Sequence, residues 1–312
     1  MSAPQQALHH FLQGLEISDA LVNKASDQHT HLRTQLQRQL ATRDNFLSGS
    51  YARGTAIRPL NDIDVFVVLD AAQHGGPDGT TPSRLLHELR GVLQAVYPNK
   101  DAPRLQTRSV NLEFSGTGIA YDVVPAFQDP RDPDVYHVPD RERDDWIPTN
   151  PRVHIAASTA ANERAGKMLK PLVKAAKRWN SDADKPLRSF HLEVMACNTL
   201  TTKPESWVEG LATLFDGLVE AVAQPCPEPA RLGPRLDEGV DVARALRALK
   251  DAAALARAAE IAARAGREGE AHHHLRQLLG EDYPEIGAPQ AAPRATPAVG
   301  SAAADHPRVR HG

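Results

Sequence analysis

The chain has 312 residues, and its 36 Lys and Arg against 39 Asp and Glu leave a formal net charge of −3. This balance excludes a globally basic nucleic-acid-binding protein, and the sequence carries no strong nucleic-acid signal. No stretch approaches the ~18 uncharged apolar residues of a membrane span, so no membrane partner is expected. No signal peptide is visible, and the two cysteines, Cys197 and Cys226, exclude a disulfide scaffold and favour the cytoplasm.

The first half of the chain mixes helices and strands. Apolar residues at helical spacing predict an amphipathic helix over Glu16–Ala41. The β-branched run Ile63–Leu69 predicts a buried strand, followed by a Gly- and Pro-rich loop. Three further elements are expected in chain order: a helix over Ser83–Ala95, a strand over Arg108–Phe114, and a strand over Ile119–Val124 that ends at Pro125.

The second half is predicted to be helical. The Pro- and Asp-rich stretch Asp129–Pro151 is interpreted as a connection between two lobes. The helices beyond it are expected over Ser158–Trp179 with a kink or break at Pro171, Phe190–Leu200, Trp207–Val222, and twice within Val240–Leu279. We therefore predict an α/β (α+β) protein with a sheet-containing unit over residues 1–130 that includes an N-terminal helix, a helical lobe over 151–285 and a disordered tail over 286–312.

Two carboxylates open the strongest strand. Asp62 and Asp64 stand two residues apart, so the period of a strand places both on one face. Carboxylates held this close repel each other, and the usual remedy is a divalent cation such as Mg²⁺ or Mn²⁺. A third acid, Asp122, lies in an apolar strand where an unpaired carboxylate would be costly. Together the three would form a platform for two metal ions in an in-line phosphoryl displacement.

A Gly-Ser pair precedes this strand. Gly49 would let the backbone approach a phosphate closely, and Ser50 would add a hydroxyl and an N–H donor at the start of a short helix. Each piece also has a plain structural interpretation: Asp-x-Asp can be a solvated strand start, and Gly-Ser can be only a turn. The ordered combination of the three pieces favours a catalytic site.

This pattern resembles the DNA polymerase β-type nucleotidyltransferase superfamily and, more narrowly, the cyclic GMP-AMP synthase/DncV-like nucleotidyltransferases (CD-NTases). The resemblance is carried by the segments GSYARGTAIRPLNDIDVFVVL, IAYDVVPAF and LKPLVKAAKRWN…LRSFHLE. It implies a bilobal fold, in which residues 1–130 form the catalytic core with a small mixed sheet and the helical lobe closes a nucleotide-binding cleft.

The resemblance also implies roles for particular residues. Asp62, Asp64 and Asp122 would be the catalytic, metal-binding acids, and Gly49 and Ser50 would hold the donor triphosphate. The remaining nucleotide-binding candidates are Lys174 and Lys177 at the β- and γ-phosphates, Ser189 at a phosphate, and Phe190 stacked on a base. Two lysines on a helix fit a solvated face equally well, and a phenylalanine fits the core.

The function implied by the resemblance is synthesis of a cyclic di- or trinucleotide second messenger from ATP and other nucleoside triphosphates, in bacterial antiphage signalling. A ribose hydroxyl would attack an α-phosphate with Mg²⁺ or Mn²⁺ bound, and pyrophosphate would leave. An activator or regulatory protein is a further possible partner. The alternatives are a nucleotidyltransferase that modifies a protein or RNA, and a catalytically silent sensor or scaffold of the same fold.

Several other charged or titratable residues are interpreted as structural or solvent-exposed rather than as part of the site. Arg53 and Arg58 flank the Gly-Ser pair and are interpreted as structural rather than phosphate-binding. The adjacent histidines His272–His274 are read as a solvated run. The terminal Gly312 raises conjugation to other molecules as a separate hypothesis, which unchanged conjugates after deletion of the tail in the native cell would dismiss.

Overall fold

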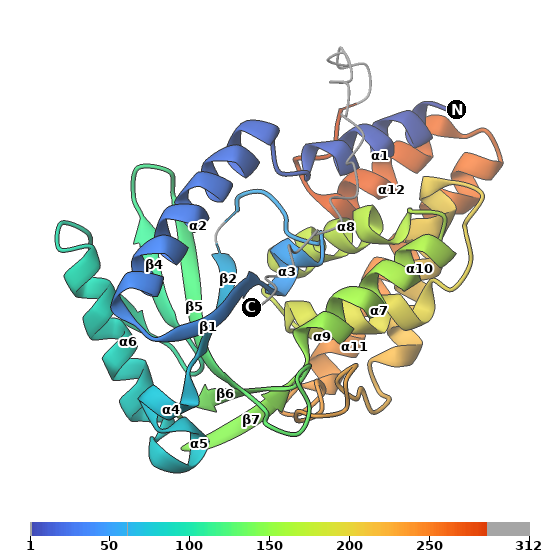
Figure 1. Ribbon diagram of the computed structural model, residues 1–312. Coiled ribbons are helices and arrows are strands. Elements are labelled where there is room, and N and C mark those ends of the chain that lie inside the picture. Colours follow the sequence, from blue (N-terminus) through green and yellow to red (C-terminus); the bar gives the residue numbers. More distant parts are fainter. Residues whose placement is uncertain (1, 61, 286–312) are drawn as a thin grey trace, which may run out of the picture.

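The computed structural model describes residues 2–60 and 62–285. Figure 1 shows a sheet-containing lobe on one side and a bundle of helices on the other. The predicted α/β (α+β) class is confirmed by the mixed seven-stranded sheet and its helical partner lobe. The predicted tail over 286–312 lies outside the described residues.

The sheet is built around two parallel strands, β2 (Asp62–Leu69) and β5 (Ile119–Gln128). All other neighbours in it pair antiparallel. The outer strands are β1 (Thr42–Leu47) beside β2, β4 (Val110–Phe114) beside β5, β3 (Arg104–Leu105) at the edge, and β6 (Tyr136–Asp140) with β7 (Asp145–Thr149) beyond the end of β5.

The two faces of β2 have different surroundings. Ile63, Val65 and Val67 are buried in a cluster with apolar residues of α2 (Asp19–Gln39) and α6 (Pro82–Val96), which cover that face. Phe66 and Val68 belong to a smaller cluster with residues of β5, β6 and β7. Because side chains alternate along a strand, Asp62 and Asp64 begin this second face, and the apolar cluster starts where the acids stop.

The second lobe is a helical bundle with its own apolar core. Its helices are α7 (Pro151–Arg164), α8 (Leu169–Asp182), α9 (Ser189–Thr199), α10 (Trp207–Ala221), α11 (Val242–Arg264) and α12 (Glu268–Leu279). The first helix of the chain, α1 (Ala3–Gly14), also packs there through Leu8, Phe11 and Leu12, beside α12 in Figure 1. None of the helices within the described residues combines the length and the apolarity needed to cross a bilayer.

The structure corrects the prediction for the segment Asp129–Pro151. This segment contains the hairpin β6–β7 rather than only a connection, and its buried side chains close one face of the sheet. The strand β5 also continues through Pro125 instead of ending there. β5 pairs with β4 only as far as Val123, and its pairing with β6 begins at Phe127. Pro125 therefore lies between these two pairings, where the lack of an N–H is tolerated.

Smaller differences concern helices and loops. The single helix expected over Ser158–Trp179 is two helices, and the break lies at residues 165–168, where Gly166 and Lys167 have positive φ angles. Pro171 sits in the first turn of α8, where its missing N–H costs little. The sequence did not predict α1, β1, or the short helices α4 (Ala71–His74) and α5 (Gly76–Gly79), whereas the short helix expected to start at Ser50 is α3 (Gly49–Ala52).

Candidate functional site

Strand register brings the predicted acids together. Asp64 of β2 and Asp122 of β5 are direct partners across the parallel ladder, whose strands lie about 4.8 Å apart. Asp62 lies two residues earlier on β2 and is exposed, and its charge acts on both other carboxylates. The structure therefore places these three predicted acids at one end of the central strand pair.

These carboxylates are electrostatically strained. Burial and, after it, the charge of Asp122 raise the pKa of Asp64 to about 6, with a further raise by Asp62 and an opposing lowering by Arg53. Burial also raises the pKa of Asp122, opposed by a hydrogen bond of 2.7 Å from Asn111 Nδ2 to its Oδ1. Sequence reasoning missed Asn111, whose only signal was a polar residue within the strand Arg108–Phe114. The carboxylate charges are therefore disfavoured unless a cation balances them.

Among the residues that the structure describes, no three His, Cys, Asp or Glu side chains stand as a formed metal site. The donor chemistry of Asp62, Asp64 and Asp122 nevertheless fits a hard divalent cation, because all three offer carboxylate oxygens. Burial and, after it, repulsion by Asp122 raise the pKa of Asp64, and a bound cation would favour the charged carboxylate against both effects. These three residues are therefore the ones that would hold a metal.

The Gly-Ser turn lies directly against the acids. Gly49 begins α3 with a φ of +63°, and a Cβ atom built on it would lie 1.6 Å from Asp64 Oδ2. The N–H of Ser48 donates to the backbone oxygen of Asp64 at 2.9 Å. The positive φ and the overlap of a Cβ with Asp64 favour glycine at position 49, and the hydrogen bond of Ser48 holds the turn beside β2.

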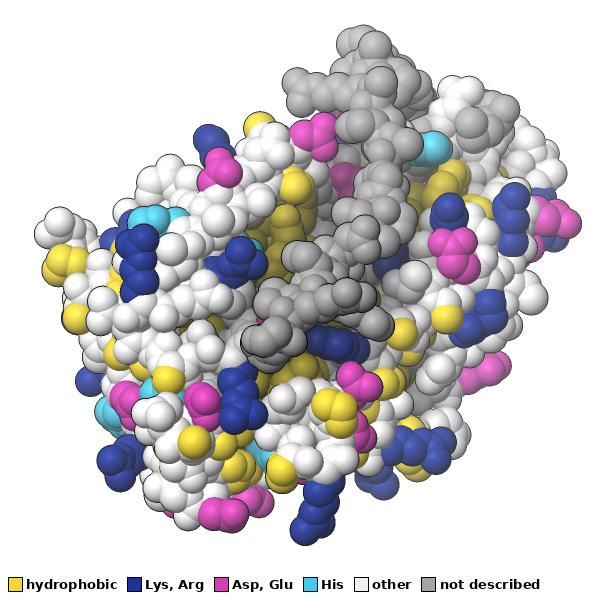
Figure 2. Space-filling model, in the orientation of Figure 1, with side chains coloured by type: hydrophobic (Ala, Val, Ile, Leu, Met, Phe, Trp, Pro, Cys, Tyr) yellow, Lys and Arg dark blue, Asp and Glu magenta, His cyan; other side chains and the backbone are white. Residues whose placement is uncertain are grey.

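A cavity of about 1300 Å³ lies between the two lobes. Most of the predicted site residues line it: Gly49, Ser50, Asp62, Asp64, Asp122, Lys177, Ser189 and Phe190. The space-filling view in Figure 2 shows dark-blue basic side chains scattered over both lobes on this face, not gathered in one patch. This arrangement suits a small ligand bound between the lobes better than a long nucleic acid on the surface.

The two candidate lysines have different surroundings, although both are buried on α8. Lys177 lines the cavity, and its Nζ donates to the backbone oxygen of Thr55 at 2.9 Å and to Glu193 Oε1 at 3.1 Å. Lys174 does not line the cavity and instead pairs with Glu16 Oε2 at 2.5 Å. The structure thus brings Lys177, but not Lys174, to the other candidates.

Ser189 and Phe190 begin α9 at the cavity wall. Phe190 is half-buried, with the guanidinium carbon of Arg53 4.5 Å from its ring centroid and the ring of His154 5.1 Å away. Its ring packs against the helical core and also borders the cavity. Stacking on a base stays a prediction.

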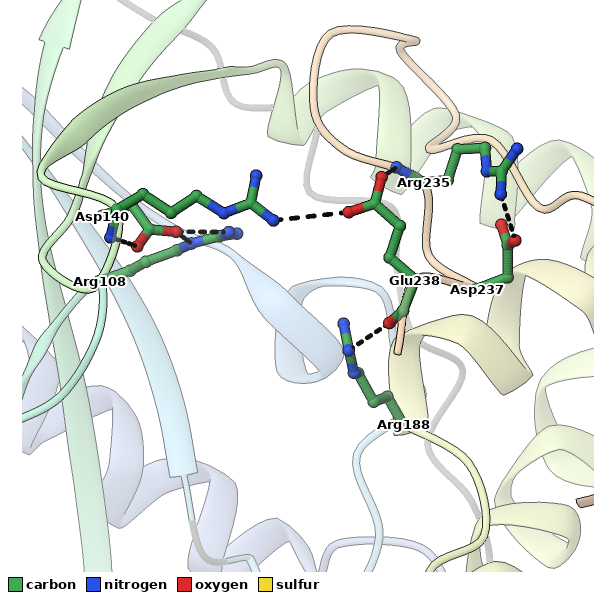
Figure 3. A network of polar contacts seen from close by, with 7 residues as sticks. Arg108, Asp140, Arg188, Arg235, Asp237 and Glu238 are labelled. Carbon is green, nitrogen blue, oxygen red and sulfur yellow. Dashed lines mark hydrogen bonds and ion pairs between the residues drawn. The ribbon is translucent and has the colours of Figure 1, made fainter. Parts of the chain in front are cut away.

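A polar network at the mouth of the cavity was not predicted (Figure 3). From the sheet lobe, Arg108 pairs with Asp140 at 2.9 Å, and Arg143 reaches Glu238 at 3.5 Å in the segment before α11. Arg188, just before α9, donates to the backbone oxygen of Glu238 at 2.5 Å. These contacts join residues up to about a hundred positions apart, so no local spacing could signal them.

Comparison with known proteins places this geometry in a family. Residues 1–162 match the model described as "Second Messenger Oligonucleotide or Dinucleotide Synthetase domain". A cyclic AMP-AMP-AMP synthase of Escherichia coli strain MS 115-1 is 31% identical over 182 residues, which are 55% of this chain and 55% of that protein. One of Acinetobacter sp. is 28% identical over 253 residues, 75% of this chain and 69% of the relative. The chain thus spans about half the length of the first of these relatives.

Solved structures share the fold. The structure of E. coli MS115-1 CdnC with ATP has a TM-score of 0.73 at 22% identity and covers 90% of this chain and 99% of that chain. The Bradyrhizobium diazoefficiens CD-NTase CdnG in complex with GTP has a TM-score of 0.72 at 16% identity and covers 90% of this chain and 96% of that chain. The E. coli MS115-1 CdnC:HORMA-deltaN complex has a TM-score of 0.70 at 21% identity, over 90% and 98%. At these identities the likeness shows the fold alone.

Proposed function

The chain belongs to the Second Messenger Oligonucleotide or Dinucleotide Synthetase family, the CD-NTases of the polymerase β-like superfamily, and on that premise we propose that it is a nucleotidyltransferase that joins nucleoside triphosphates into a cyclic di- or trinucleotide. One observation carries the proposal. Asp64 and Asp122 are register partners directly beside the Gly49–Ser50 turn, in the wall of a cavity between the lobes.

The reaction is transfer of a nucleotidyl group. The oxygen of a ribose hydroxyl forms a bond to the α-phosphorus of a triphosphate, the bond from that phosphorus to the β-phosphate bridging oxygen breaks, and pyrophosphate leaves. A divalent cation, Mg²⁺ or Mn²⁺, would supply charge neutralisation for the phosphates and for Asp62, Asp64 and Asp122. A second transfer within the same cavity closes the ring of a dinucleotide, and a third closes that of a trinucleotide, with one pyrophosphate released at each transfer.

The protein side chains position and neutralise the reactants. Asp122 accepts the proton of the attacking hydroxyl, a role that suits a carboxyl whose pKa burial has raised. The N–H groups of Gly49 and Ser50 bind the donor triphosphate, and Lys177 lies in the same cavity wall to balance its charge. Ser189 contacts a phosphate, and Phe190 packs against a base. Lys174 would act only indirectly, because it lies outside the cavity lining.

The comparisons favour particular substrates. Two relatives are named cyclic AMP-AMP-AMP synthases, which supports ATP as a substrate and a cyclic trinucleotide as the product. Others are named CBASS oligonucleotide cyclases, and a related fold was solved with a HORMA partner, which supports a role in antiphage signalling and a protein regulator. A cytoplasmic location stays a prediction from the sequence.

The other functions have less support. A protein or RNA acceptor calls for a continuous binding surface beside the acids, whereas here the acids line a cavity between the lobes. A silent scaffold has no use for three clustered carboxylates that repel one another, because such a cluster destabilises the fold.

The test is direct product analysis. The purified protein is incubated with all four α-labelled ribonucleoside triphosphates and Mg²⁺ or Mn²⁺, treated with phosphatase, and analysed by chromatography and mass spectrometry. A phosphatase-resistant product that is lost in Asp64→Ala is expected and would name the bases. Label on protein or RNA in a lysate, without a free product, would favour the macromolecular acceptor. Full activity of Asp64→Ala would overturn the mechanism.

A further inference from the structure

A buried polar network joins the two lobes in the wall of the cavity. Glu193 of α9 is 3% exposed, and its Oε2 accepts from Arg53 Nε at 2.9 Å and from Thr55 Oγ1 at 2.7 Å. Its Oε1 accepts from Lys177 Nζ at 3.1 Å, and the same ammonium donates to the backbone oxygen of Thr55 at 2.9 Å. All four side chains are buried.

This network ends on the backbone of the phosphate-binding turn. The N–H of Arg53 donates to the carbonyl of Gly49 at 3.1 Å, and the N–H of Thr55 donates to the carbonyl of Ser50 at 2.9 Å. Ala56 also donates to the carbonyl of Ser50, at 3.1 Å, but Arg53 and Thr55 are the two of these donors whose side chains Glu193 binds. Displacement of Glu193 would therefore loosen two of the three donors to the turn carbonyls together.

The charges in the network do not cancel. Two cations, Arg53 and Lys177, surround one carboxylate, and burial of charge is tolerable only with such pairing. Burial alone raises the pKa of Glu193, but the cations and hydrogen bonds outweigh it and hold that pKa below its usual range. The remaining positive charge lies behind the Gly49–Ser50 turn and favours a phosphate chain there.

Within residues 2–60 and 62–285, no apolar cluster joins the turn to the helical lobe. The buried apolar residues around the sheet and those of the helical lobe form separate clusters. The contact between the turn and α8–α9 is made by the hydrogen bonds of Glu193 and Lys177 and by the guanidinium of Arg53 over the ring of Phe190. The Glu193 carboxylate thus accounts for two of the hydrogen bonds that tie the residues after the turn to the helical lobe.

We infer that Glu193 is a positioning residue that holds the Gly49–Ser50 turn for the β- and γ-phosphates of the donor nucleotide. The inference rests on the proposed function, because it assumes that a triphosphate binds at this turn. Glu193 acts through Arg53, Thr55 and Lys177 and does not itself contact the substrate. Its replacement should selectively weaken recognition of the outer phosphates.

The experiment compares binding of AMP and of the non-reacting analogue α,β-methylene-ATP, both with Mg²⁺, by calorimetry. In Glu193→Gln the affinity for the analogue is expected to fall by about tenfold or more, while that for AMP changes by less than about twofold. The matched control is Glu16→Gln, which removes the partner of Lys174 away from the cavity and should leave both affinities unchanged.

A milder variant covers the case in which Glu193→Gln fails to fold. Thr55→Val removes one of the donors to Glu193 and keeps the side-chain shape. It should lower the affinity for α,β-methylene-ATP by about threefold and leave the affinity for AMP unchanged. Equal loss for both ligands, or no loss for the analogue, would overturn the positioning role. If the wild-type protein bound the analogue no better than AMP, the proposed function itself would fail, and the inference with it.

Discussion

The close approach of Gly49 to Asp64 leaves no room for a side chain at position 49 unless Asp64 moves. The φ of +63° disfavours any side chain at Gly49, and a Cβ would overlap the carboxylate of Asp64. We expect Gly49→Ala to lose nearly all product formation, because Asp64 must move or the turn must open. Product analysis by mass spectrometry checks this.

Gly118 provides the matched control for this substitution. It has a φ of +69°, but a Cβ there would meet nothing within 4 Å. Gly118→Ala should carry the same backbone strain, about 1–2 kcal/mol, and retain activity. Equal loss of activity in both variants would show that strain, and not the contact with Asp64, is responsible.

The ionised form of Asp64 lowers the stability of the folded protein. The folded-state pKa of Asp64 is raised to about 6 from an ordinary 3.8, so the folded state loses stability as pH rises through 6. In metal-free buffer at pH 8, Asp64→Asn should therefore raise the melting temperature, by about 2–4 °C for each kcal/mol of repulsion relieved. Calorimetry at pH 5 and pH 8 measures this.

The same Asp64→Asn variant should form no product. Asp62→Asn is the comparison, because Asp62 is exposed and its replacement should stabilise the fold less. A melting temperature for Asp64→Asn that is unchanged or lower at pH 8 would contradict the repulsion argument.

At the scale of elements, one side chain organises the first part of the segment between α10 and α11. Glu228 accepts from the N–H groups of Ala230 and Leu232, both at 3.1 Å, and it contacts His154 of α7. Burial alone raises the pKa of Glu228, but these hydrogen bonds outweigh it and lower the pKa to about 2. This carboxylate connects the cavity mouth to α7.

We expect Glu228→Gln to lower the free energy of unfolding at pH 7 by about 1–3 kcal/mol. Because the folded pKa of Glu228 lies below its ordinary 4.5, the contribution is complete above pH 4.5 and disappears as pH falls toward 2. Urea unfolding at pH 7 and pH 3 should therefore show a difference between variant and wild type that shrinks in acid.

The control for this prediction is Glu238→Gln in the same segment. The side chain of Glu238 is 46% exposed and pairs with Arg143 at 3.5 Å, so its loss should cost less than about 1 kcal/mol at pH 7. A cost as large as that of Glu228→Gln would mean that the mouth network in Figure 3 is more important for stability than its exposure suggests.

At the scale of the whole molecule, the size of the cavity matters. Its volume of about 1300 Å³ exceeds the range of about 300–1,000 Å³ for sites that hold one drug-sized ligand. We expect two nucleotides to bind at once, as attack of one on the other requires. Equilibrium dialysis with α,β-methylene-ATP and Mg²⁺ should approach two ligands per chain, and saturation at one would contradict simultaneous binding.

The sequence by itself determined much of this molecule, because the informative signals are local. Alternation along Ile63–Leu69 and the spacing of Asp62 and Asp64 identify a strand with acids on one face, and the strand residues do lie where the pattern predicts. The helices of the second half follow from their 3.6-residue periodicity. The resemblance in these segments was enough to indicate the family, which the family model confirms.

Only the tertiary structure decided how distant segments meet. Parallel pairing sets Asp122 beside Asp64, and the lobe arrangement sends Lys177 to the cavity and Lys174 to Glu16, although the two lysines are three residues apart on one helix. The role of Glu193 depends on partners that lie more than a hundred residues away in the chain. Periodicity reports which side of an element is buried, whereas the partner it meets depends on long-range packing that no local pattern encodes.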